Sequence, residues 1–292
     1  MLNRDRLDAV LQPAGQKAAL YAGMLTPGLH MTPSFLICGA QRGGTTSMYQ
    51  ALRQHPNVLR PFLHKGVHYF DVAPQRSLNW YRAHFPFTVQ GARRGRRTGH
   101  EAVTFESSPY YLFHPLAAGR IAAALPGIKV LILLRDPVER AYSAHAHELA
   151  RGFETEPFAR ALELEDARVA GEEEKLIADP TYVSHAHQHQ AYLRRGLYID
   201  QIERMAGAVG REHVHLVDSE DFFTDPEPVW DAVINFLGLP PQHGREFRRH
   251  NARPRAEMPP ELRARLSERF IESDERLAQW WGRAPSWRRG DA

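Results

Sequence analysis

Short apolar runs alternate with longer segments of mixed polarity along most of the chain. The apolar runs are short and bounded by turn residues, which predicts buried strands at residues 34–38, 103–105, 129–134 and 213–217. We expect helices in the segments between and after them, at residues 45–54, 80–86, 115–125, 192–208 and 226–237. A further helix opens at Pro137, and residues 154–178 form a charged, mostly helical excursion.

Alternating strands and helices predict an α/β fold, with a doubly wound, mainly parallel sheet flanked by helices. The run KVLILL at residues 129–134 is apolar from Val130 to Leu134, which indicates a strand inside a parallel sheet. Residues 92–99 (ARRGRRTG) predict an exposed basic turn. There is no internal repeat or linker, so we expect one domain over residues 34–292, preceded by a helix and tether at residues 1–33.

Amino-acid composition limits the classes of protein to which this chain can belong. The 292 residues are 43% hydrophobic, enough to bury a sizeable core, and the formal charge is +3 with arginine outnumbering lysine. An arginine-rich basic balance suits an anionic ligand, but no basic stripe with interleaved aromatics points to nucleic acid. Cys38, the single cysteine, is expected to be a buried thiol. No window is apolar enough for a membrane helix and no signal peptide is evident, so we expect a cytoplasmic protein.

The first candidate site is the glycine-rich segment at residues 39–46, GAQRGGTT. It follows a predicted strand and opens a predicted helix, an arrangement in which backbone N–H groups and a helix N-terminus cradle a phosphate. Thr45 stands where a triphosphatase loop has its lysine, and Arg42 lies inside the loop. No metal-binding aspartate follows a strand convincingly. A magnesium triphosphatase is therefore disfavoured, and an ordinary tight turn stays open.

The second candidate site is RDPVERAYS at residues 135–143. Arg135 ends the most apolar strand, at the edge where ligands bind in open α/β sheets, and Ser143 lies two helical turns further on. The two side chains are placed to hold a second phosphate. The alternative is an ordinary capping and ion-pair cluster of Arg135 with Asp136, Glu139 and Arg140.

Together these segments resemble the sulfotransferases that use 3′-phosphoadenosine 5′-phosphosulfate (PAPS). GAQRGGTTSMYQAL is similar to their 5′-phosphosulfate loop, and RDPVERAYS is similar to their 3′-phosphate-binding segment. The likeness continues in order along the chain through KGVHYFD, WYRAHFP, FESSPYYLF, RGLYIDQIERM, VHLVDSEDFFTDPEPVWDAVINFLGLP and RPRAEMPPELRARL. It covers residues 34 to the C-terminus. The nearest branch is that of bacterial sulfotransferases akin to the heparan sulfate N- and O-sulfotransferases.

The resemblance implies a P-loop-like nucleotide-binding core that transfers a sulfonate group from PAPS to a hydroxyl or amine. The acceptor would be a small molecule, a carbohydrate or a lipid, and the reaction would need no metal. Donor binding would fall to Arg42, Gly43, Gly44, Thr45, Thr46, Ser47, Arg135, Ser143 and Arg253. Arg42 would stabilise the leaving phosphate electrostatically, and Lys65 would face the sulfonate.

The catalytic base departs from the family pattern. The lysine–glutamate–x–histidine segment of the family reads Lys65-Gly66-Val67-His68 here, so glycine replaces the glutamate often taken as the base. His68 and Glu106 are the remaining candidates, the first as an imidazole of near-neutral pKa and the second at the end of a predicted strand. Glu106 could instead orient His68 or hold an acceptor group.

Two other functions stay open. A small-molecule kinase would use the same loop but would depend on magnesium, and a PAPS-binding protein without turnover would be consistent with Gly66. Acceptor selectivity is expected in residues 154–189. Within them His185 and His189 are spaced one helical turn apart, as in some zinc sites, but a polar helix or acceptor lining is the stronger interpretation.

Overall fold

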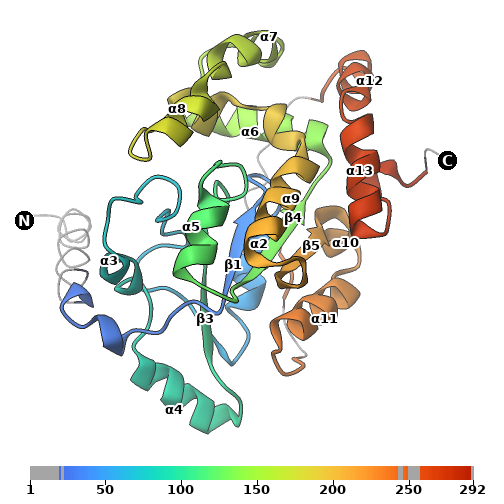
Figure 1. The fold of residues 1–292 in the computed structure, drawn as a ribbon. Coiled ribbons are helices and arrows are strands. Elements are labelled where there is room, and N and C mark those ends of the chain that lie inside the picture. Colours follow the sequence, from blue (N-terminus) through green and yellow to red (C-terminus); the bar gives the residue numbers. More distant parts are fainter. Residues whose placement is uncertain (1–19, 21–22, 243–245, 249–256, 291–292) are drawn as a thin grey trace, which may run out of the picture.

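The computed structural model describes residues 20, 23–242, 246–248 and 257–290, and they form a five-stranded sheet covered by helices on both faces (Figure 1). Every neighbouring pair of strands is parallel, and the order across the sheet is β2-β3-β1-β4-β5. The strands are β1 (Phe35–Gly39), β2 (Val58–Leu59), β3 (Val103–Ser107), β4 (Lys129–Leu134) and β5 (Val214–Asp218). The predicted doubly wound α/β fold is confirmed.

The helices alternate with the strands and then continue beyond the last one. Those described are α2 (Thr45–Leu52), α3 (Leu78–Arg82), α4 (Thr88–Thr98), α5 (Ala117–Ala124), α6 (Pro137–Arg151), α7 (Phe158–Val169), α8 (Glu172–Ala178), α9 (Tyr198–Val209), α10 (Ser219–Thr224), α11 (Pro226–Leu237), α12 (Pro260–Glu268) and α13 (Ile271–Trp281). Short turns lie at η1 (Pro27–Leu29), η3 (Arg194–Gly196), η4 (Arg211–His213) and η5 (Ser286–Arg288), and η2 (Ala186–Gln190) is a π-helix. None of these helices is long and apolar enough to cross a membrane.

Successive side chains of a strand point to opposite faces of the sheet, and here helices cover both faces, so the strands are buried on both sides. In β4, Val130, Ile132 and Leu134 pack with residues of α5 and α9 in one apolar cluster. Leu131 and Leu133 pack with residues of α2 and α11 in the other. A third cluster lies outside the sheet, between α6, α7 and α12. The continuous apolar sequence of β4 thus reflects burial between two helical layers.

The positions of β1 and β4 create the crevice used for ligand binding in open α/β sheets. The two strands are neighbours, with Ile37 beside Leu131. The chain leaves β1 towards β2 and β3 on one side, and it leaves β4 towards β5 on the other. Because the two connections diverge, a gap opens at the carboxyl edge between them. The predicted phosphate loop and the segment beginning at Arg135 meet at this gap.

Helix α4 corrects the predicted basic turn at residues 92–99. Those residues belong to a helix of eleven residues, Thr88–Thr98, that ends at Gly99 with a left-handed φ of 77°. Only Gly91 is buried in it, so the helix has no apolar stripe for a sequence pattern to reveal. Arg96 and Arg97 in the last turn complement the helix dipole.

Two other predicted helices have different bounds in the structure, for local reasons. The helix predicted over residues 192–208 starts only at Tyr198, because the backbone N–H groups of Leu193 and Arg194 donate to the Glu165 carboxylate instead. The helix predicted over residues 80–86 runs from Leu78 to Arg82, since Ser77 caps it. The two-residue strand β2 was not predicted. Most of the predicted N-terminal helix and tether lies outside the described residues.

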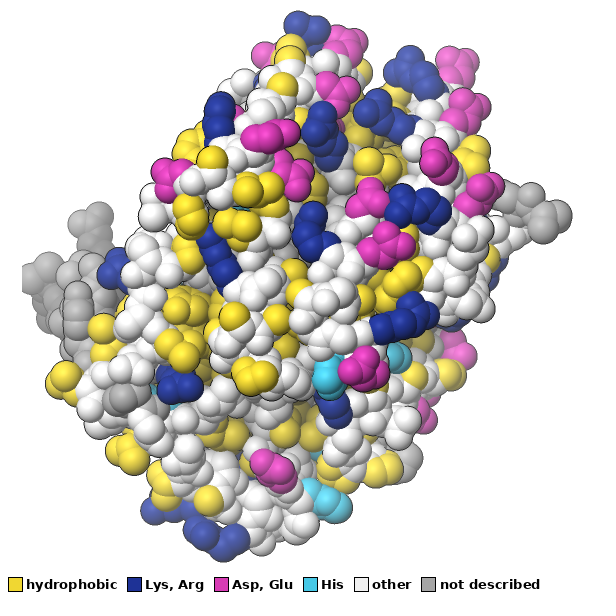
Figure 2. Space-filling view, in the orientation of Figure 1, with side chains coloured by type: hydrophobic (Ala, Val, Ile, Leu, Met, Phe, Trp, Pro, Cys, Tyr) yellow, Lys and Arg dark blue, Asp and Glu magenta, His cyan; other side chains and the backbone are white. Residues whose placement is uncertain are grey.

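Charges of both signs alternate over the upper part of the surface around α7 and α12 (Figure 2). Several are paired along or between helices, including Arg160 with Glu163 and Arg276 with Asp200. Exposed pairs of this kind contribute little to stability. Most of the charged side chains therefore belong to an ordinary solvated surface.

Candidate active site

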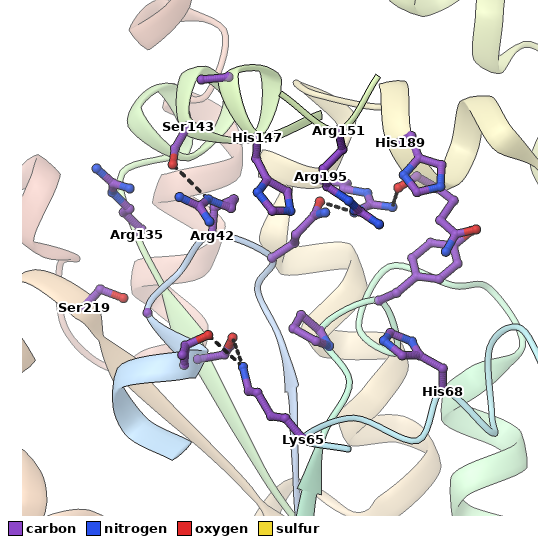
Figure 3. A pocket seen from close by; sticks show the side chains of 18 of the residues that line it. Arg42, Lys65, His68, Arg135, Ser143, His147, Arg151, His189, Arg195 and Ser219 are labelled. Atoms are coloured by element: carbon purple, nitrogen blue, oxygen red, sulfur yellow. Dashed lines mark hydrogen bonds between the residues drawn. The ribbon is translucent and has the colours of Figure 1, made fainter. Parts of the chain in front are cut away.

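A cavity of about 490 Å³ opens at the carboxyl edge of the sheet, between the loop after β1 and helix α6. Five cationic side chains line it, and Glu220 is the one carboxylate among its lining residues. The cations are Arg42, Lys65, Arg135, Arg151 and Arg195 (Figure 3). Such an excess of positive charge in a concave site favours an anionic ligand.

The glycine-rich loop forms one wall of the cavity, as predicted for a phosphate cradle. Gly44 has a left-handed φ of 91°, a conformation that glycine adopts without strain, and it turns the chain into α2. Thr45 and Thr46 then line the cavity at the helix N-terminus, where backbone N–H groups lack helical acceptors. Gly43 and Ser47 are buried behind this surface, and the Gly43 carbonyl accepts a hydrogen bond from the Ser219 hydroxyl.

Lys65 brings an ammonium group to the loop from a different segment. Its Nζ donates to Thr46 Oγ1 at 3.0 Å and to Thr45 Oγ1 at 3.2 Å. Burial lowers the pKa of Lys65 to about 7. Lys65 therefore supplies, from a different segment, the ammonium group that the loop itself lacks, and its pKa lies close to neutral pH.

Arg42 points to a different part of the cavity from Lys65. Its backbone is left-handed, with φ of 67°, and its Nε donates to Ser143 Oγ on α6 at 3.0 Å. Arg135 lies beyond it on the same side of the cavity (Figure 3). The structure thus groups Arg42 with the two residues predicted for the 3′-phosphate, while Lys65 accompanies the loop hydroxyls.

The ion-pair cluster considered from the sequence is also present. Arg135 Nη2 lies 3.3 Å from Glu139 Oε2, and Asp136 caps α6 by accepting from the Val138 N–H. Arg263, from α12, lies 3.2 Å from both the Asp136 and Glu139 carboxylates. Arg135 and Arg263 together balance the two carboxylates of Asp136 and Glu139, so Arg263 frees Arg135 in part from its pairing with Glu139. Arg253, the remaining predicted donor residue, lies outside the described residues.

His68 enters the cavity paired with Asp71. Its Nδ1 lies 2.8 Å from Asp71 Oδ2, the His68 side chain is 40% exposed, and the Asp71 side chain is fully buried. With Nδ1–H donating to the carboxylate, the lone pair of Nε2 remains available as a base. Burial alone would lower the pKa of His68, but the hydrogen bond to Asp71 and the charges of Asp71 and Glu106 outweigh burial and raise it. His68 also has a left-handed φ of 54°, a strained conformation for a side chain of this kind.

Glu106 does not line the cavity. It is fully buried within β3, and its carboxylate accepts hydrogen bonds from the Val67 N–H and from the hydroxyls of Ser108, Tyr81 and Tyr111. Burial raises the pKa of Glu106, against the effect of these hydrogen bonds. Since Val67 precedes His68 directly, the geometry favours the positioning role for Glu106 over the role of base.

Gly66 packs too closely against β3 to be replaced by the family's glutamate. A Cβ at residue 66 would lie 2.4 Å from the Ser107 carbonyl oxygen and 2.9 Å from Ser108 Oγ. The Ser107 N–H also donates to the Lys65 carbonyl at 2.9 Å, which fixes this approach. The backbone at residue 66 thus leaves no room for a glutamate side chain.

We expect the substitution Gly66→Glu to destabilise the protein rather than to supply a better base. The forced backbone shift should cost about 1–3 kcal/mol of unfolding free energy and should move Lys65 and His68. Thermal and urea unfolding check this prediction, with Gly119→Glu as the matched control, because a Cβ at residue 119 meets nothing within 4 Å. A Gly66→Glu variant with unchanged stability and raised activity would contradict it.

Arg195 is a charged residue of the site that the sequence did not single out. It is 5% exposed, its guanidinium donates to Gln41 and to the carbonyls of His187 and Gln188, and it stacks over Tyr110 at 4.8 Å. It pairs with no carboxylate of the described residues, and burial lowers its pKa to about 10. A buried charge without an acidic partner is costly, so its retention beside the cavity suits an anionic ligand.

Of the three histidines at residues 185–189, His189 is the one that lines the cavity. His189 Nδ1 lies 3.0 Å from Glu148 Oε2 and lines the cavity, whereas His185 packs beside it at 5.0 Å between ring centres. Among the residues that the structure describes, no three histidine, cysteine, aspartate or glutamate side chains gather closely enough to hold a metal ion.

Comparison with known proteins identifies the family. The model of the sulfotransferase domain matches residues 32–254. The chain belongs to the sulfotransferase family. A crystal structure of a sulfotransferase from Alicyclobacillus acidocaldarius superposes with a TM-score of 0.64 at 30% identity, covering 88% of this chain and 99% of that one. The resemblance inferred from the loop and from residues 135–143 is confirmed.

The curated relatives of this sulfotransferase include enzymes of heparan sulfate modification. The mouse heparan sulfate glucosamine 3-O-sulfotransferase 5 is 28% identical over 72% of this chain, and the human heparan sulfate glucosamine 3-O-sulfotransferase 6 is 29% identical over 73%. The human bifunctional heparan sulfate N-deacetylase/N-sulfotransferase 1 is 29% identical over 71%. The chain spans 54% of the length of each of the two 3-O-sulfotransferases and 22% of the bifunctional protein.

Several residues of the sulfotransferase site escaped the sequence reasoning. Asp71 follows His68 by three residues within the segment KGVHYFD, and Arg195 opens the segment RGLYIDQIERM, so the resemblance already contained both positions. Gln41 lies inside the predicted loop and Ser219 follows the predicted strand at residues 213–217, but neither was singled out; His147 lies beyond the segment at residues 135–143.

Proposed function

We propose that this chain transfers a sulfonate group from PAPS to a hydroxyl group of a polar acceptor, and that Lys65, His68 and Asp71 carry the chemistry. The observation that supports the proposal most strongly is the contact of Lys65 with Thr45 and Thr46 at 3.2 and 3.0 Å. This contact brings a partly buried cation to the N-terminus of α2, in a cavity with five cationic side chains.

The donor fits the cavity in two halves. The N-terminus of α2, the threonine hydroxyls and Lys65 would hold the 5′-phosphosulfate, since all three favour a compact anion. Arg42, Ser143 and Arg135 would hold the 3′-phosphate, because they converge from the loop and from α6 on the other side. The site thus matches the two anionic groups of PAPS with two separate sets of donors.

The transfer needs a proton acceptor and stabilisation of the leaving phosphate. The acceptor oxygen bonds to sulfur, the bond from sulfur to the bridging phosphate oxygen breaks, and the acceptor's proton passes to Nε2 of His68. Asp71 holds His68 in the required tautomer and stabilises the imidazolium that forms. Lys65 stabilises the charge that develops on the bridging oxygen, and its lowered pKa also allows it to supply a proton there.

The acceptor would bind on the wall opposite the phosphate loop. Gln188 and His189 from η2, with His147 and Arg151 from α6, make this wall polar and partly cationic. Such a lining suits a carbohydrate hydroxyl better than an apolar acceptor. Some curated relatives are named as heparan sulfate sulfotransferases, and this is a further reason to propose a glycan acceptor.

The donor assignment predicts tight, metal-independent binding of the product 3′-phosphoadenosine 5′-phosphate (PAP). Calorimetric titration of the full chain should give binding that is unchanged by EDTA and stronger than that of ATP. Arg135→Ala should weaken it by about 10- to 100-fold, the value of a lost hydrogen bond to a charged group. The matched control is Arg276→Ala, because Arg276 pairs with Asp200 and Glu203 on the surface.

Two results would contradict the donor assignment. The first is a magnesium-dependent preference for ATP, which would restore the kinase interpretation of the loop. The second is PAP binding that Arg135→Ala and Arg276→Ala weaken equally, which would place the nucleotide elsewhere.

A further inference from the structure

A mixed apolar and basic surface lies away from the active site, around the first turns of α4. We propose that this surface docks the protein onto the anionic face of a lipid bilayer. The surface, called the α4 patch below, consists of Leu25, Leu29, Phe62, Phe87, Val89, Arg93, Arg96 and Arg97.

The apolar half of the α4 patch is unusually exposed. Leu25 is 85% exposed, Leu29 55% and Val89 50%. Phe62 and Phe87 are exposed as well. Together these five make up more than half of the nine large apolar side chains that are exposed in the described residues. Single exposed apolar residues are common, but a cluster of this kind indicates a binding surface.

Contacts between three separate segments make the patch continuous. Thr88 Oγ1 donates to the Leu29 carbonyl at 3.1 Å, which joins the segment before β1 to the start of α4. The rings of Phe62 and Phe87 lie 6.1 Å apart, and the Phe62 N–H donates to the His84 carbonyl. These contacts bring the three segments that carry the apolar side chains side by side.

The basic half of the patch continues along α4. Val89, Arg93, Arg96 and Arg97 are spaced by four, seven and eight residues from the first, so they lie on the same side of the helix. The three arginines are exposed, and none forms an ion pair with a described residue. Hydrophobic side chains and Lys or Arg side chains lie together along the lower left border of the molecule, over α4 (Figure 2).

The charge of this surface is mostly of one sign. Residues 23–31, 60–64 and 86–100 contain no aspartate or glutamate, and the exposed Glu101 follows just beyond the end of α4. Elsewhere on the surface, arginines such as Arg160 and Arg276 pair with carboxylates. A predominantly basic surface is complementary to an anionic partner.

The combination of chemistries favours a bilayer over other anionic partners. A nucleic acid or an acidic polysaccharide would engage the arginines but would leave the leucines, Val89 and the phenylalanines in water. A bilayer accommodates both halves, with apolar side chains at the boundary of headgroups and acyl chains and arginines among the acidic headgroups. No residue of the α4 patch lines the active-site cavity, so docking would leave that cavity open.

Vesicle flotation with the full chain tests the proposal. The protein should float with phosphatidylcholine vesicles that contain phosphatidylserine and should not float with pure phosphatidylcholine. Replacing Arg93, Arg96 and Arg97 by alanine should weaken binding by about 100-fold, at about fivefold for each arginine near an anionic surface. The matched control replaces Arg160, Arg265 and Arg269 by alanine, which changes the net charge equally and should leave binding unchanged.

A second pair of substitutions tests the apolar half. Leu25→Ser with Val89→Ser should also weaken flotation by at least tenfold, whereas Ile271→Ser, at a side chain 44% exposed on α13, should not. Circular dichroism and PAP titration should be the same for all variants. The proposal is overturned if the wild-type chain does not float, if both arginine triples weaken flotation equally, or if removal of residues 1–19 alone abolishes it. It is also overturned if the same variants instead dissociate a dimer in light scattering or lose binding to heparin without any vesicle binding.

Discussion

Replacing Lys65 by methionine is expected to lower kcat/KM for PAPS by about a hundred- to a thousand-fold, the effect of removing one donor from a preorganised site for developing charge. Methionine keeps the length of the side chain but cannot donate to Thr45 or Thr46. The loop itself provides no lysine, so no neighbouring ammonium can take over. Steady-state kinetics with the best acceptor check this expectation, and Lys129→Met, on a lysine that ends near Phe236 away from the cavity, is the matched control.

The protonation of Lys65 gives the same prediction an independent measurement. In the free protein its pKa is lowered to about 7 by burial, and a bound anion favours the charged form. PAP binding at pH 8 should therefore take up about one proton per site, which calorimetry in buffers of different ionisation enthalpy detects. Affinity should fall as pH rises above 7. Unchanged kinetics in Lys65→Met, or proton uptake that persists in this variant, would exclude the proposed role of Lys65 in donor binding and catalysis.

Replacing His68 by asparagine is expected to lower kcat by about a hundred- to ten-thousand-fold, the usual contribution of a general base. Asparagine retains a donor for Asp71 but cannot accept the acceptor's proton. PAP binding should change little, since the imidazole faces the acceptor side. A variant that loses PAP binding and turnover together would indicate a structural role instead.

The pH dependence of kcat separates His68 from Glu106 as the base. A base must be unprotonated, so activity should fall as pH drops through the pKa of His68, which Asp71 raises above the ordinary value. Asp71→Asn removes that charge and should move this acidic limb to lower pH. Glu106→Gln should lower stability and leave the limb in place, because Glu106 accepts hydrogen bonds that hold the segment of Val67. Loss of the limb in Glu106→Gln alone would assign the base to Glu106.

The sheet was predictable because its strands have unambiguous sequences. Residues 130–134 are apolar on both faces, and the loop at residues 39–46 follows directly from another apolar run. Their ends had to meet at one edge, so the proximity of the loop to Arg135 followed from topology. Helix α4 failed the same reasoning, since a helix with only one buried residue has no apolar stripe to detect.

The chemistry at the cavity was only partly predictable, because long-range packing decides which atoms meet. Lys65 lies twenty residues from Thr45, and its approach depends on the hydrogen bond from the Ser107 N–H to its carbonyl. Arg42 turned towards Ser143 rather than towards the loop hydroxyls. No local sequence pattern predicts either of these contacts. The pairing of His68 with Asp71, by contrast, lies within four consecutive residues and was within reach of the sequence.

The most direct test of the proposed function follows the sulfonate itself. PAPS with a radiolabelled sulfonate is incubated with the full chain, EDTA and a panel of carbohydrate acceptors, and both labelled acceptor and PAP are quantified. We expect one labelled acceptor for each PAP formed by the wild-type chain, and almost none with Lys65→Met or His68→Asn. A protein that binds PAP but transfers no label, or transfer that survives both substitutions, would contradict the account.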